Sequence, residues 1–311
     1  MFAIGSPIDS LPNELLIAVL STLESRELLP LTLVDRRFDA TATTILQHRL
    51  LHTVKKLEGH DMVLESYHPV AKQSTPTMTC RFLGLSVPNH TRTGGRDMGL
   101  RDLSRLYSHF RPVVSEETRR MRRVFGRRPP GGPTEQEVGD EPVTQELVLD
   151  DGVLFSQLCT TTNLIKSGSI PGLLSSYSNI THGVVRVWRN WLAEAAASSA
   201  VCPAGRSSDK NTILWTDEAR TVGLKLRVAE VTLERLPPYH GLDEDPPVAY
   251  SLYYEGKFNP TPPPDSAASD PKWLTVTSEL LVRTSHLLLA LERSALQEVA
   301  NSGRATIITP M

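Results

Sequence analysis

The sequence predicts an α+β protein, in which a small N-terminal three-helix segment precedes a β-rich, sandwich-like domain with long mobile loops. Two patterns carry this prediction. Apolar residues recur every three or four positions before residue 52, as they do in amphipathic helices. After residue 60 they alternate with polar residues in short runs, as in half-buried strands. We therefore expect a helical segment over 6–52 and a β-rich domain over 58–300.

The helical segment begins with an apolar ridge formed by Leu11, Leu15, Leu16, Val19, Leu20 and Leu23. Pro12 suits the first helical position, where a missing N–H costs little. Ser25 is placed to cap a second helix, but Pro30 would remove one of its hydrogen bonds, so a delayed start or a kink is expected there. Phe38 to Leu46 continue a third helix.

Short strands are predicted over 62–68, 79–87, 145–150, 183–189, 213–215, 222–228 and 249–255. The alternation changes parity near Ala229, which predicts a bulge or bend there. The segment 154–165 is predicted to be a helix. In the segment 279–300 the first half alternates loosely, whereas the second half has helical spacing.

Four stretches rich in Pro, Gly, Ser and charged residues predict mobile insertions within the second domain, over 86–99, 125–142, 196–211 and 259–271. No repeat of fixed period is visible, which excludes the common repeat architectures.

Charge and cysteine content restrict the classes of function. The 33 Lys+Arg and 35 Asp+Glu residues give a net charge of -2, which argues against a globally basic nucleic-acid binder. The three cysteines are far apart, so a reducing compartment, the cytoplasm or nucleus, is expected. No secretory signal and no membrane span is predicted.

Several local signals allow two interpretations. The arginine-rich run 119–128 could be a nuclear-localisation signal, but its charge is also balanced by the acidic residues over 135–151. The aromatic residues could line a recognition surface or fill the core of the β-rich domain; they are Trp188, Trp191, Trp215, Tyr250, Tyr253 and Tyr254. His60 and His68 have no partner at metal-ligand spacing, and the common catalytic motifs are missing. We therefore expect no metal, no cofactor and no catalytic residue.

The segment LPNELLIAVLSTLESRELLPLTLVDRRF resembles an F-box. It has the LPxEL opening, an apolar ridge to Leu23, a leucine-rich second helix and a Val-x-Arg-Arg-aromatic close. Asp35 stands where many members carry Cys or Ser, and Phe38 replaces a frequent Trp. Segments beyond residue 60, such as GVVRVWRNWLA, resemble the C-terminal regions of uncharacterised fungal F-box proteins.

The resemblance implies a substrate-recognition subunit of an SCF-type cullin–RING ubiquitin ligase. Such a subunit binds a Skp-family adaptor, and through it the cullin and RING subunits, and holds an unknown protein target in its second domain. The resemblance assigns adaptor binding to Leu11, Pro12, Leu15, Leu20, Leu23, Leu28, Leu31 and Val34. Without the resemblance, the leucine content of the helical segment would favour packing of its apolar surface on the downstream domain. The alternative functions are an adaptor-binding scaffold outside a cullin ligase and an enzyme located after residue 60.

Overall fold

The computed structural model describes residues 8, 11–69, 77–86, 98–114, 143–150, 152–168, 172–201, 213–231, 248–258 and 274–300. Its helices are α1 (Asn13–Leu20), α2 (Ser25–Leu31), α3 (Arg36–Leu51), α4 (Thr53–Lys56), α5 (Leu100–Leu103), α7 (Arg189–Val201) and α8 (Thr284–Ala300). Its strands are β1 (His60–Tyr67), β2 (Met78–Ser86), β3 (Tyr107–Val114), β4 (Val143–Leu149), β5 (Phe155–Ser167), β6 (Leu174–Trp188), β7 (Ile213–Trp215), β8 (Val222–Lys225), β9 (Arg227–Val231), β10 (Val248–Phe258), β11 (Leu274–Thr277) and β12 (Glu279–Arg283).

Two antiparallel sheets form the body of the protein. The larger has eight strands in the order β6-β5-β1-β2-β3-β12-β8-β7. The smaller contains β11, β10 and β4, and β9 also pairs with β10. One hydrophobic core joins the two sheets, because Leu64 and Leu158 of the larger sheet lie in the same cluster as Leu147 and Leu252 of the smaller. The predicted combination of three N-terminal helices and a following β-rich part is confirmed, and the strands are antiparallel.

The prediction of a helix over 154–165 is wrong, because this segment forms strand β5. Leu154 and Leu158 are four residues apart, which imitates helical spacing. The face of β5 that enters the core is partly polar, since Ser156, Thr160 and Thr162 are buried together with Leu158. Buried threonines concealed the alternation, although their β-branched side chains favour strands.

The bulge or bend expected near Ala229 in the run 222–231 lies at a different residue. The break lies at Leu226, between β8 and β9, and not at Ala229. Strand β8 pairs with β12 in the larger sheet, whereas β9 pairs with β10 in the smaller. Leu226 is buried, so it places an apolar side chain in the core where the chain passes from one sheet to the other.

The other predicted strands occur as β1, β2, β4, β6, β7 and β10. Strand β3 was not predicted, and β6 begins earlier than expected, at Leu174. The segment 279–300 divides into β12 and α8, which agrees with its two periodicities. The start of the segment 196–211, which was expected to be a loop, instead forms the last turns of α7. The other expected loops lie wholly or mostly outside the described residues; they are 125–142, 259–271 and most of 86–99.

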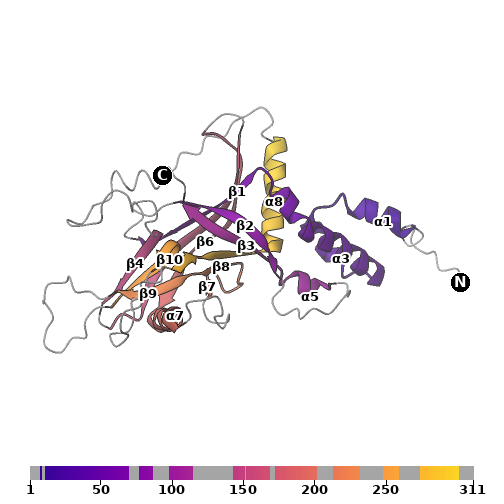
Figure 1. Cartoon of the computed structure of the whole chain (residues 1–311). Helices are drawn as coiled ribbons and strands as arrows, with labels where there is room; N and C mark the ends of the chain where they lie inside the picture. The colour runs from indigo at the N-terminus through magenta and orange to yellow at the C-terminus, as the bar shows by residue number, and fades with distance from the viewer. Residues whose placement is uncertain are drawn as a thin grey trace, which may run out of the picture.

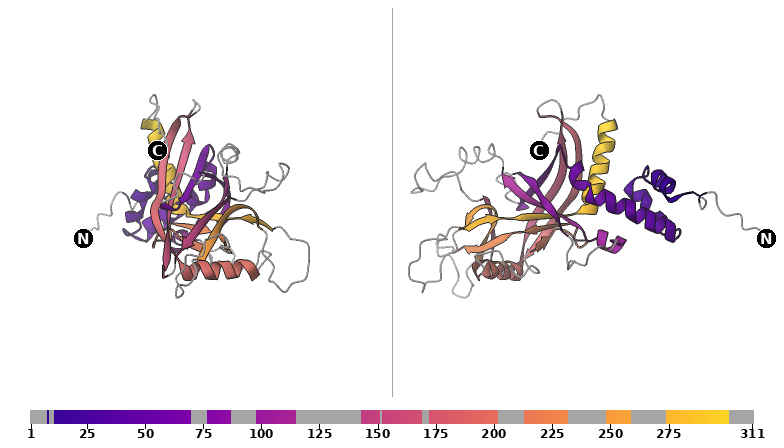
Figure 2. Two further views of the ribbon diagram at one scale, coloured as in Figure 1. Left: turned by 90° about the vertical axis from the view of Figure 1, so that its left-hand side faces the viewer. Right: turned by 45° about the vertical axis from the view of Figure 1, so that its right-hand side comes forward.

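Helix α8 connects the two parts of the protein. Figure 1 shows it standing between the sheets and the N-terminal helices, and Figure 2 shows α7 at the opposite end of the sheets. Leu287, Ala290 and Leu291 enter the core between the sheets, whereas Leu288 belongs to a second cluster with the N-terminal helices. The orientation of these helices on the β-rich domain is therefore set by packing on α8.

Candidate functional site

The N-terminal helical module, defined as α1 to α4, has an apolar core of its own that other elements complete. Leu16, Leu20 and Leu28 pack against one side of α3, which contributes Ala42, Ile45, Leu46 and Leu50. Leu103, Leu106 and Leu288, from the β-rich domain, close the same cluster. Part of the surplus apolar surface is thus buried on the downstream domain, as composition alone favoured.

Another part of that surface stays exposed. We call it the outer apolar surface and define it by Leu15, Val19, Leu29, Leu33 and Val34, whose exposed fractions are 53%, 56%, 51%, 86% and 62%. Helix α1 is apolar on both sides, because its inward positions are also leucines. A helix that is apolar all round is normally covered on all sides, so the exposed side of α1 is suited to a partner.

The structure places the eight predicted adaptor-binding residues in three environments. Exposed are Pro12, Leu15 and Val34, and partly exposed are Leu11, Leu23 and Leu31. Leu20 and Leu28 are 4% and 0% exposed and form the centre of the module core. These two side chains support the outer apolar surface from beneath and do not contribute to it.

Sequence reasoning missed three residues of this surface, Val19, Leu29 and Leu33. The signal was present, because Val19 follows Leu15 and Leu33 follows Leu29 by four positions, which is one helical turn. Val19, Leu29 and Leu33 were not assigned to the adaptor site because neighbouring leucines at the buried positions supplied a stronger pattern.

Polar contacts hold the start of α1 next to the corner between α2 and α3. The Asp35 carboxylate accepts the backbone N–H groups of Arg37 and Phe38 at 2.7 and 2.8 Å, so it caps α3. The Arg37 guanidinium donates to Asn13 Oδ1 at 2.9 Å and also to the Leu11 carbonyl. Leu11 and Val34 therefore lie on elements that are fixed relative to each other.

A delayed start or a kink was expected in α2 because of Pro30, but the helix starts at Ser25 without delay and Pro30 lies in its last turn. The prediction that Ser25 caps this helix is wrong, because Glu24 is the N-cap and Ser25 is the first helical residue. After it the chain forms i→i−3 hydrogen bonds, such as Thr32 N–H to the Leu29 carbonyl at 3.2 Å. The helix thus tightens and ends where the proline removes a donor, and the following turn exposes Leu33 and Val34.

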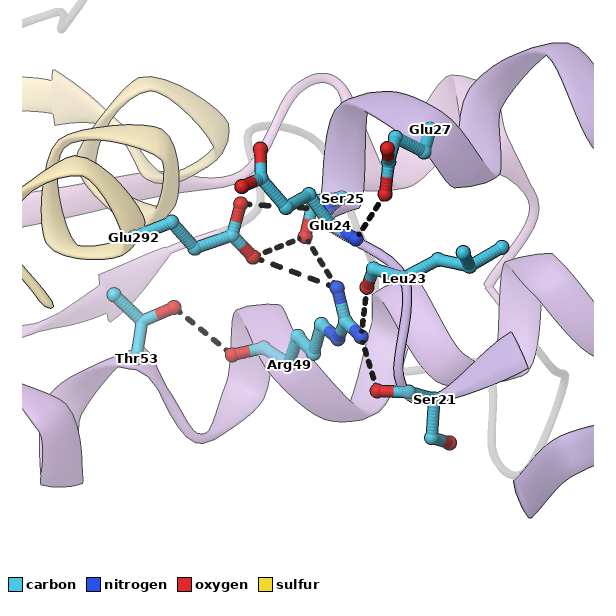
Figure 3. A network of polar contacts seen from close by, with 8 residues as sticks. All are labelled: Ser21, Leu23, Glu24, Ser25, Glu27, Arg49, Thr53 and Glu292. Atoms are coloured by element: carbon cyan, nitrogen blue, oxygen red, sulfur yellow. Dashed lines mark hydrogen bonds and ion pairs between the residues drawn. The ribbon is translucent and has the colours of Figure 1, made fainter. Parts of the chain in front are cut away.

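A polar network joins the module to α8 (Figure 3). The Ser25 hydroxyl donates to Glu292 Oε1 at 2.6 Å, and the Arg49 guanidinium lies 3.4 Å from the same oxygen. Arg49 also donates to the carbonyls of Ser21 and Leu23 at 2.9 and 2.7 Å. The side chains of Arg49 and Glu292 are only 14% and 17% exposed, so this network is shielded from most of the solvent.

A second polar cluster lies between α8 and the larger sheet. His60 Nε2 is 2.9 Å from the Ser294 hydroxyl, and Lys166 forms an ion pair with Glu298 at 2.8 Å. Burial, and then the nearby charge of Lys166, lower the pKa of His60 below its ordinary 6.5. Ser294 is fully buried, and Glu298 approaches the same ring nitrogen of His60 that the serine contacts. The cluster therefore lacks the exposed nucleophile and the separately oriented base of a hydrolase triad.

Within the described ranges, no helix is long and apolar enough to cross a membrane. The same residues contain no group of three or more His, Cys, Asp or Glu arranged to hold a metal ion. The arginine-rich run 119–128 lies outside them. No protein-family model matches the chain, and no curated protein or solved structure is significantly similar to it.

Proposed function

We propose that the protein is a substrate-recognition subunit of an SCF-type ubiquitin ligase, which binds a Skp-family adaptor through its N-terminal helical module. The observation that supports this most is the outer apolar surface, where Leu15, Val19, Leu29, Leu33 and Val34 are all exposed on or beside two short helices. Leucine and valine side chains in this number stabilise a protein–protein contact when they are buried together. The F-box-like order of residues in 11–38 supports a Skp-family adaptor as the partner.

The fixed attachment of the module to α8 is consistent with this role. A ligase subunit that holds a target must keep it within reach of a ubiquitin-conjugating enzyme, and a fixed geometry raises the effective concentration of the target. The contacts of Glu292 with Ser25 and Arg49 limit movement between the adaptor-binding end and the β-rich domain. Catalysis then belongs to the other subunits.

The test uses charged substitutions on the outer apolar surface. In the variant Leu15→Asp/Val34→Asp, both carboxylates would be buried against the adaptor, so we expect at least about 100-fold weaker binding in a pull-down. Ala40→Asp adds one carboxylate at an exposed position of α3 outside this surface, so it is the control for each of the single variants Leu15→Asp and Val34→Asp and for the double variant. Leu20→Asp is unsuitable, because Leu20 lies in the core and its replacement would unfold the module.

Two outcomes would contradict the proposal. If Leu15→Asp/Val34→Asp binds the adaptor as well as Ala40→Asp does, the outer apolar surface is not the docking site. If the adaptor is recovered from cells with this protein but without cullin, the protein is an adaptor-binding scaffold that acts outside a cullin ligase.

A further inference from the structure

Strand β6 forms one edge of the eight-stranded sheet, and helix α8 caps only its first part. The Tyr177 N–H donates to Gln297 Oε1 at 2.9 Å, and the Asn179 carbonyl accepts from Arg293 at 2.9 Å. The backbone groups of Tyr177 and Asn179 point away from β5. Side chains of α8 thus form the hydrogen bonds that a neighbouring strand would otherwise form with these two residues. Edges protected in this way do not pair with other chains.

In the second part of the edge, the even-numbered residues and not the odd-numbered ones direct their backbone groups away from β5. The pairing with β5 shifts between Thr162 and Asn163, which leaves Ile180 as an extra residue in β6. Beyond Ile180 the odd-numbered residues direct their backbone N–H and C=O groups toward β5, as the hydrogen bond from the Arg189 N–H to the Leu154 carbonyl at 2.8 Å indicates. The outward backbone groups therefore belong to His182, Val184, Arg186 and Trp188, and these have no strand partner among the described residues.

The side chains of these four residues all lie on the solvent face. Val184 and Trp188 are 58% and 49% exposed. The Trp188 ring packs against Phe155 with 5.4 Å between centroids, and the Arg186 guanidinium lies 5.3 Å from the centre of the Phe155 ring. No carboxylate in the described part of the chain forms an ion pair with Arg186.

We propose that residues 182–188 of β6 bind an extended polypeptide segment as an added strand, and that this segment carries an acidic side chain with an apolar side chain two residues away on each side. The unpaired backbone groups require an extended chain. The acidic side chain would lie opposite Arg186, and the apolar ones opposite Val184 and Trp188. Because this order is symmetric, the segment fits in either direction.

A second copy of the same edge fits less well. If two β6 edges paired along 182–188, each Arg186 would lie opposite or diagonal to the Arg186 of the other copy. Like charges at these positions oppose strand pairing. The charge of the edge therefore favours a different, acidic chain.

This inference rests on the sheet alone and goes beyond the proposed adaptor binding. If the protein is a ligase subunit, the edge is the surface that holds its target. The experiment needs no adaptor, so the two proposals can fail separately.

The probe is a fluorescent, end-capped peptide of sequence Thr-Val-Thr-Glu-Thr-Val-Thr, titrated with the full-length protein and followed by fluorescence polarisation. We expect it to bind about fivefold more tightly than the same peptide with a central lysine, because Arg186 attracts one and repels the other. The glutamate peptide with methyl groups on the backbone nitrogens that would face β6 should bind more than about tenfold more weakly, since it loses several backbone hydrogen bonds.

Two variants assign the binding to this edge. Arg186→Glu should reverse the preference, so that the lysine peptide binds more tightly; this gain cannot come from misfolding. Val184→Pro should abolish binding and leave the β5–β6 ladder intact, because the Val184 N–H points away from β5. Equal binding of the glutamate and methylated peptides would overturn the proposal, as would an unchanged preference in Arg186→Glu. A dimer in sedimentation that Val184→Pro dissociates would also overturn it, in favour of a second copy as the occupant.

Discussion

Replacing Glu292 by alanine would remove three contacts between α8 and the N-terminal helical module. The carboxylate accepts from the Ser25 hydroxyl at 2.6 Å and from the Ser25 N–H at 3.3 Å, and it lies 3.4 Å from Arg49. Loss of one hydrogen bond to a charged group costs about 1.5–3 kcal/mol, and breaking a fully buried ion pair costs about 3–5 kcal/mol. Arg49 keeps two carbonyl partners, and both charged side chains retain some solvent contact. We therefore expect Glu292→Ala to lower the free energy that holds the N-terminal helical module against α8 by about 2–4 kcal/mol.

That loss should appear as local opening of the module and not as global unfolding. Hydrogen exchange followed by mass spectrometry should show amides of α1 and α2 exchanging about 30- to 1,000-fold faster, while β1 and β5 keep the wild-type rate. Glu292→Gln retains an oxygen that can accept from Ser25, so its effect should be smaller. Unchanged exchange in α1 and α2 of Glu292→Ala would refute the role assigned to the network.

Three further predictions concern the β-rich domain. Tyr254→Phe leaves the buried Ser66 hydroxyl without its 2.7 Å partner and should cost about 1–3 kcal/mol in urea unfolding, whereas the double change with Ser66→Ala should recover much of it. The pKa of His60 is lowered by burial, so below pH 6.5 the unfolded chain binds more protons and the melting temperature should fall as pH falls; His60→Gln should flatten this decline. Gly223→Ala would place its methyl carbon 2.9 Å from the Trp215 ring and should cost about 1–3 kcal/mol, again measured in urea.

The elements that could be predicted have buried faces formed mainly by apolar residues. Helix α1 was predicted from the apolar ridge that includes Leu16 and Leu20, and β1 was predicted from the alternation around Leu64. Two stretches of strand that were not predicted have small polar residues among their buried side chains. Strand β3 buries Ser108, and the unpredicted start of β6 buries Ser176, so neither shows the simple alternation on which strand prediction depends.

The proposed adaptor site was predicted only in part, for a related reason. Periodicity identifies the helices that carry leucines, but it cannot decide which of two apolar sides faces the core. In the structure Leu20 and Leu28 share one core cluster with residues of α3, α5 and α8, and two of these three helices come from distant parts of the sequence. The division between core and outer surface is therefore a tertiary property that local spacing does not contain.

The closure of the module by α8 has a consequence for synthesis of the chain. Ser25 and Glu292, which bond directly, are separated by 267 positions. At roughly 5–20 residues per second, the ribosome needs about 13–53 s to make the second partner after the first. Throughout that interval the leucines of the first helices lack the part of their cover that Leu288 supplies. The helices of the module are thus made well before the helix that completes their core, and in that interval their apolar side chains are open to chaperones.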